Sequence, residues 1–138
     1  MVVLSIIGIV IALILVVLFI KVSNAHSVKV YGYEIFNAGN FIVSVLGYLA
    51  IYFGNRWYSD ALKEHGDLLN GELLMGIGGL FLLAVVYLNI KNTSLLYGLV
   101  MSFVMEILYA AVTPVVLFVL FMAVAFFAET KPVYNINN

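Results

Sequence analysis

The longest apolar run of the chain, Thr93–Ala128, contains a single formally charged residue, Glu106. A chain of 138 residues has no soluble core large enough to bury such a segment. About 20 apolar residues already cross the hydrocarbon core of a bilayer, so the run is longer than one ordinary crossing needs. The sequence therefore predicts a protein whose solvent is lipid.

Composition supports this class and excludes others. Hydrophobic residues make up 65% of the chain and charged residues 9%, whereas soluble proteins carry about 25% charged residues. The net charge of −1 comes without a basic block, so we expect no nucleic-acid partner. The absence of cysteine excludes disulfides and thiolate metal sites. His26 and His65 lie far apart in the sequence, so we expect no metal and no cofactor.

Four apolar blocks predict an all-α, polytopic membrane protein with four transmembrane helices at about 2–20, 35–54, 72–90 and 95–128. Residues 1–128 then form a single domain, and 129–138 form a polar tail. The polar stretches at 21–34, 55–71 and 91–94 connect the blocks.

The first block could also be a cleaved signal peptide, because Ser23-Asn24-Ala25 resembles a small-residue cleavage site. The segment before the block has no Lys or Arg, and the block is longer than a typical signal core. We therefore expect an uncleaved first helix.

The fourth block is too long for one straight crossing. Its helix would measure about 50 Å, against a hydrocarbon core of about 30 Å. Thr113-Pro114 lies near its middle, so it is either one helix kinked at Pro114 or two shorter segments. A hairpin would expose unpaired backbone groups to lipid, so the kinked helix is favoured. Ser94 or Thr93 can cap its start.

Polar residues recur at helical spacing on two of the blocks and so share one face on each. The second block carries Asn37, Asn40, Ser44, Tyr48, Tyr52 and Asn55, and the fourth carries Ser102, Glu106, Tyr109 and Thr113. Small residues that allow close helix packing occur on the first and third blocks, at Gly8, Ala12, Gly76, Gly78 and Gly79. These faces form either the packed interior of a bundle or a hydrated pathway.

Glu106 is the candidate functional residue. If the fourth helix enters the membrane near Leu95, the carboxyl lies about 16 Å deep, at the level of Ser44 and Tyr48. Tyr48 could then donate a hydrogen bond to it. A carboxylate at this depth is costly and is often functional, as a proton-coupling or ion-binding group. The structural alternative is a neutral acid bonded between helices, or a salt bridge across a subunit interface. If Ala110–Ala128 is the true span, Glu106 instead lies near the membrane surface.

Four crossings put both termini on one side, and the Lys and Arg residues then divide three against three. The positive-inside rule chooses no orientation. Without a nucleophile–base or metal-ligand pattern, we do not expect an enzyme.

Three functions fit these features. We expect an oligomeric protein of a bacterial cytoplasmic (inner) membrane that forms or lines a channel-like assembly, or a non-catalytic subunit of a larger membrane complex. The partners would be lipid and further copies or other membrane subunits. The alternatives are a small proton-coupled transporter that uses Glu106, and a membrane immunity or defence protein that binds another membrane protein.

Overall fold

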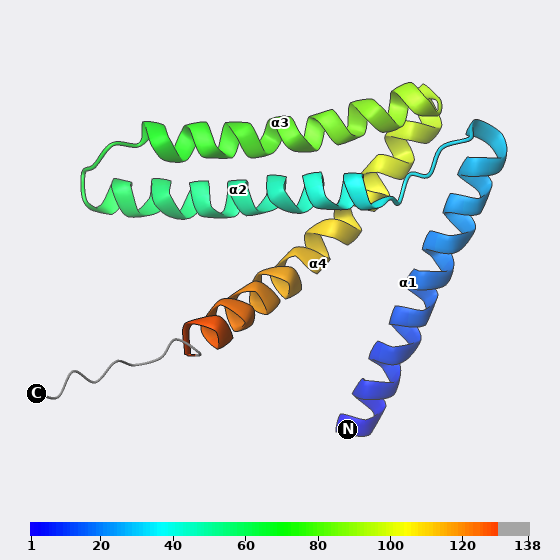
Figure 1. The fold of residues 1–138 in the computed structure, drawn as a ribbon, viewed down its shortest axis with the longest axis horizontal. Coiled ribbons are helices and arrows are strands. Elements are labelled where there is room, and N and C mark those ends of the chain that lie inside the picture. The colour runs from blue at the N-terminus through cyan, green and yellow to red at the C-terminus, as the bar shows by residue number, and fades with distance from the viewer. Residues whose placement is uncertain (130–138) are drawn as a thin grey trace, which may run out of the picture.

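A computed structural model describes residues 1–129 and contains four helices within them (Figure 1). They are α1 (Val2–Tyr31), α2 (Ala38–Lys63), α3 (Leu69–Asn92) and α4 (Leu95–Glu129). All four are long and apolar enough to cross a membrane, which confirms the all-α class and supports a membrane protein. Most of the tail predicted at 129–138 lies outside the described residues.

The helices are longer than the apolar blocks that predicted them. α1 continues to Tyr31, through much of the stretch expected as a polar connection, and α2 continues to Lys63. Hydropathy marks the part of a helix that suits lipid, whereas local backbone chemistry ends the helix. α1 stops at Gly32, whose left-handed backbone (φ 68°) lets its N–H bond to the Val28 carbonyl oxygen.

Side-chain caps set two of the helix starts. The Asn37 Oδ1 atom accepts a hydrogen bond of 2.8 Å from the backbone N–H of Asn40 at the start of α2. The Ser94 Oγ atom accepts one of 3.2 Å from the backbone N–H of Tyr97 in the first turn of α4. The predicted cap of the fourth helix is therefore confirmed at Ser94.

α2 and α3 lie side by side and antiparallel along their length, joined by a short connection (Figure 1). Glycines make this contact close: a Cβ atom added at Gly78 would lie 2.5 Å from the carbonyl oxygen of Gly47. Gly71 and Gly54 meet in the same way, at 2.8 Å. Only a hydrogen atom fits at these points, so the backbones themselves form the interface.

Of the five small residues predicted to pack helices, Gly78 alone does so among the described residues. A Cβ atom at Gly8, Gly76 or Gly79 would meet nothing within 4 Å, and Ala12 is exposed. Helical spacing shows on which face of its helix a small residue lies, but it does not show whether another helix packs against that face. The other four do not pack within the described part of the chain, so their role in helix packing stays a prediction, for contacts with a second chain.

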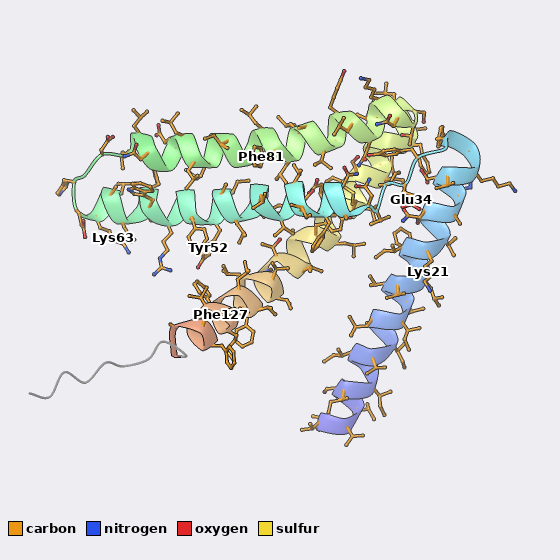
Figure 2. All side chains as sticks on the ribbon, viewed as in Figure 1. Lys21, Glu34, Tyr52, Lys63, Phe81 and Phe127 are labelled. Carbon is orange, nitrogen blue, oxygen red and sulfur yellow. The ribbon has the colours of Figure 1, made fainter. Side chains whose placement is uncertain are left out.

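α4 packs its first half against α2 and α3 and then diverges from them, while the N-terminal half of α1 extends away from the other helices (Figure 1). The buried apolar core is accordingly small and lies where the four helices converge. Its members are Ile35, Phe36, Val85, Met105 and Tyr109. Most large apolar side chains point outward, notably along α1 (Figure 2). Lipid can cover these surfaces at no cost, since acyl chains are as apolar as the side chains.

α4 is continuous through Pro114. The alternative of two shorter segments in the fourth block is therefore wrong. The helix holds 35 residues and so measures about 52 Å, well beyond the thickness of the hydrocarbon core.

Candidate functional site

The polar faces of α2 and α4 meet at the convergent end of the molecule. The buried polar residues predicted there are Asn40, Ser44, Ser102 and Thr113, with Tyr109 buried beside them. Tyr48 and Glu106 are half-buried. Asn37 instead caps α2, and Tyr52 and Asn55 are exposed. The predicted stripes therefore come together over about three turns of each helix and separate beyond them.

The first polar cluster is built around Asn89 of α3, which is fully buried. Its Oδ1 atom accepts hydrogen bonds from Asn40 Nδ2 at 2.8 Å and from Tyr33 Oη at 3.0 Å. Its Nδ2 atom donates to Ser102 Oγ at 2.9 Å. Sequence reasoning missed Asn89, although a lone amide near the end of an otherwise apolar block was a signal. The cluster locks the loop before α2 and the three helices α2, α3 and α4 together.

A second missed feature holds α1. Asn24 donates from Nδ2 to the carbonyl oxygen of Phe36 at 2.9 Å and accepts from the backbone N–H of Phe36 at 3.0 Å. Ser27 donates from Oγ to the carbonyl oxygen of Tyr33 at 2.6 Å. These bonds satisfy backbone groups of the loop before α2, so the polar end of α1 is an anchor for that loop.

The second polar cluster is built around Glu106, the candidate from the sequence. Ser44 Oγ donates to Glu106 Oε1 at 2.9 Å. Tyr48 Oη donates to the backbone oxygen of Glu106 at 3.0 Å. The expected partnership between Tyr48 and Glu106 is thus present, but the Tyr48 hydroxyl bonds to the main-chain oxygen rather than to the carboxyl group. Tyr48 lies four positions after Ser44, so one face of α2 supplies both donors.

One carboxyl oxygen of this cluster has no partner. Within residues 1–129, Glu106 Oε2 is the buried side-chain oxygen or nitrogen atom left without a hydrogen bond. The amide and hydroxyl groups of the Asn89 cluster are paired, so the two clusters differ in kind. Unpaired buried polar atoms are costly, and one in a native fold calls for an explanation such as a missing ion, water or catalytic role.

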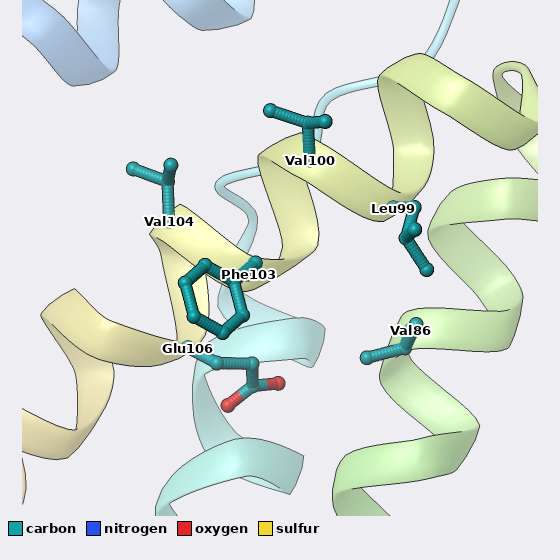
Figure 3. Close-up of a pocket in the computed structure, with 6 residues that line it drawn as sticks. All are labelled: Val86, Leu99, Val100, Phe103, Val104 and Glu106. Carbon is teal, nitrogen blue, oxygen red and sulfur yellow. The ribbon is translucent and has the colours of Figure 1, made fainter.

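Glu106 also lines a groove on the outer surface between α3 and α4 (Figure 3). The groove has a volume of about 470 Å³, and its other lining residues are apolar: Val86, Leu99, Val100, Phe103 and Val104. The Phe103 ring lies beside the Glu106 side chain, with Val86 of α3 facing them (Figure 3). Glu106 is therefore the one ionisable residue among those that line this groove, while its Oε2 atom is buried.

The remaining predicted residues have structural roles. Thr113 donates from Oγ1 to the carbonyl oxygen of Tyr109 at 2.8 Å, one turn back in the same helix. The Tyr109 ring packs edge-on against Phe36 and Phe41, with centroids 6.2 and 5.2 Å apart. These residues fix α4 against the start of α2, which places Glu106 opposite Ser44.

Among the described residues, no three His, Cys, Asp or Glu side chains come together in a way that could hold a metal ion. In comparisons with known proteins, no family model matches the chain, and neither the curated proteins nor the solved structures give a significant match.

Proposed function

We propose that the chain is a multi-pass protein of a bacterial cytoplasmic membrane that assembles with further copies, or with other membrane subunits, into a channel-like complex in which it has no catalytic role. One observation carries the proposal. The amide and hydroxyl groups of the Asn89 cluster are bonded to one another, whereas Glu106 lines a groove at the outer surface between α3 and α4. A polar path would then run between chains and pass this carboxyl.

The outer face of α3 supports assembly at the same place. Gly79 and Val86 are seven residues apart, so they lie on one face of α3. A side chain at Gly79 would meet nothing within 4 Å, while Val86 lines the Glu106 groove. A helix of a second chain that packs closely at Gly79 would therefore run along to the groove and cover it.

The test of assembly compares two neighbouring glycines in lipid nanodiscs by native mass spectrometry. Gly79→Leu fills open space, so the chain should fold normally and lose its partner. Gly78→Leu should instead damage the fold itself, because a Cβ atom there already meets the α2 backbone. A wild-type chain that is monomeric at micromolar concentration, and unchanged by Gly79→Leu, would contradict the proposal.

A second candidate, a small proton-coupled transporter that uses Glu106, is favoured by the unpaired Oε2 atom. A carboxyl oxygen without a fixed partner can gain and lose a proton without breaking a hydrogen bond of the fold. Transport assays in proteoliposomes under an imposed pH gradient separate the candidates. A transporter moves substrate only with the gradient, whereas a channel-like assembly conducts in its absence.

We also infer a bend in α4 at Pro114. Pro has no N–H to donate to the Ala110 carbonyl, and its ring crowds that group. A bend there would let a helix of 35 residues leave the polar clusters at one angle and cross the remaining lipid at another.

A further inference from the structure

Glu106 of α4 and two residues of α2, Ser44 and Tyr48, bring several oxygen atoms together between the two helices. The atoms are the carboxyl and main-chain oxygens of Glu106 and the hydroxyl oxygens of Ser44 and Tyr48. Two hydrogen bonds of 2.9 and 3.0 Å tie these groups together. Carboxylate, hydroxyl and carbonyl oxygens are the ligands that hard cations such as the alkali and alkaline-earth ions prefer.

The charge balance of the site favours a ligand that carries a single positive charge. No Lys, Arg or His occurs at positions 35–55, 72–90 or 92–128, so the apolar parts of α2, α3 and α4 supply no counter-charge for Glu106. The other ionisable side chains at these positions are Glu72 and five tyrosines, none of which carries a positive charge. One carboxylate neutralises one monovalent cation, whereas a divalent ion would leave excess charge in an apolar region.

The unpaired Oε2 atom gives the site an open ligand position. It is buried and has no hydrogen-bond partner among the described residues, while Oε1 is held by Ser44. The serine bond fixes the orientation of the carboxyl group, so the position of the free oxygen is also fixed. An ion placed there would be held by atoms that the fold has already ordered, and binding would need little rearrangement.

We propose that Glu106, Ser44 and Tyr48 form a binding site for a monovalent alkali cation, of which Na⁺ is the ion to test. The inference deepens the proposed function and rests on it, since it names the ion class for the path that passes Glu106. On binding, Ser44 keeps donating its proton to Oε1 and Tyr48 keeps donating to the main-chain oxygen of Glu106, while the lone pairs of both hydroxyl oxygens coordinate the ion.

The experiment measures equilibrium binding of ²²Na⁺ to the full chain in nanodiscs, with choline chloride holding the ionic strength constant. We expect saturable binding to the wild type. Glu106→Gln should weaken it roughly tenfold or more, since it removes the only charged ligand. Glu72→Gln is the matched control, because it removes an acid at the start of α3 outside the site, and it should bind as the wild type does.

Ser44→Ala covers the case in which Glu106→Gln fails to fold. It keeps the charge and removes one oxygen ligand, so Na⁺ binding should weaken severalfold. Absence of saturable binding to the wild type overturns the inference, as does wild-type affinity in Glu106→Gln or in Ser44→Ala. Native mass spectrometry of the same samples distinguishes the two proposals. If the protein assembles but binds no Na⁺, only the cation site is overturned. If the protein is a monomer, the proposed assembly is overturned.

Discussion

Asn40 on α2 donates a hydrogen bond of 2.8 Å from its Nδ2 atom to the Oδ1 atom of Asn89 on α3. The two side chains are 4% and 0% exposed. A bond between two amides inside an apolar surrounding has no competing water, so it fixes which turns of the two helices face each other.

Replacing Asn89 with Leu should lower the free energy of unfolding by about 1–3 kcal/mol, because Tyr33 and Asn40 each lose a hydrogen bond to its Oδ1 atom and Ser102 loses the donor to its hydroxyl. Unfolding in mixed micelles, followed by circular dichroism, measures this. Asn92→Leu is the control, since Asn92 is exposed and bonds only to Leu88 in its own helix. Equal stability of the two variants would show that the amide cluster holds nothing together.

The close contact of α2 and α3 makes a second prediction on stability. Gly78→Ala should destabilise the fold by about 1–3 kcal/mol, because the added methyl group meets the Gly47 carbonyl oxygen and the helices must separate. Gly79→Ala should be neutral or stabilise by up to about 1 kcal/mol, since alanine favours helix and the space is open. The same micelle unfolding assay compares them, and a reversed order would refute the packing described for this face.

The sequence predicted four helices because each block is apolar over a length that spans a bilayer. It also predicted that Ser44, Ser102 and Glu106 would lie on facing stripes, since polar residues repeated every three or four positions. Such a pattern shows which side chains share a face of a helix, but it does not show which residues of another helix they contact. The donor to the Glu106 carboxyl is therefore Ser44, where Tyr48 was expected.

The partners of Asn89 and the glycine contacts could not be assigned from the sequence for a different reason. A single polar residue in an apolar block has no period, so its face could not be assigned. Gly76, Gly78 and Gly79 look equivalent in the sequence, and only the position of α2 distinguishes Gly78 from the others. Helix ends were misjudged because Gly32 and local caps, rather than hydropathy, determine them.

Four crossings predict a definite pattern of chemical labelling. The chain has no cysteine, so single cysteines can be introduced one at a time. Those at Lys29 and Asn92 should react with an impermeant maleimide on one side of the membrane, and those at Lys63 and Asn138 on the other. Labelling of Lys63 and Asn138 from opposite sides would require a fifth crossing and would contradict the single long α4.

The inferred bend at Pro114 predicts a change in length. Spin labels at Leu96 and Phe126, which are both exposed near the ends of α4, report the end-to-end distance by pulsed electron resonance. Pro114→Ala restores the donor to the Ala110 carbonyl, so the helix should straighten and the distance should increase. Val115→Ala, at the exposed neighbouring position, is the control. An identical distance in all three proteins would mean that α4 is straight.

Glu106 itself gives the last prediction, which separates its contribution to folding from its function. Tyr48 bonds to the main chain and Ser102 to Asn89, so Glu106→Leu deprives only Ser44 of its partner. The variant also removes an unpaired oxygen from an apolar site, so its unfolding free energy should stay within about 1 kcal/mol of the wild type. Glu106→Gln keeps an acceptor for Ser44 and should be equally stable.

The same two variants test the function of Glu106. If the carboxyl couples protons, both variants lose pH-driven transport in proteoliposomes. If it lines a path, Gln alters ion selectivity and leaves conduction intact. A large loss of stability in Glu106→Leu, together with normal activity in Glu106→Gln, would make the residue structural and remove it as a functional site.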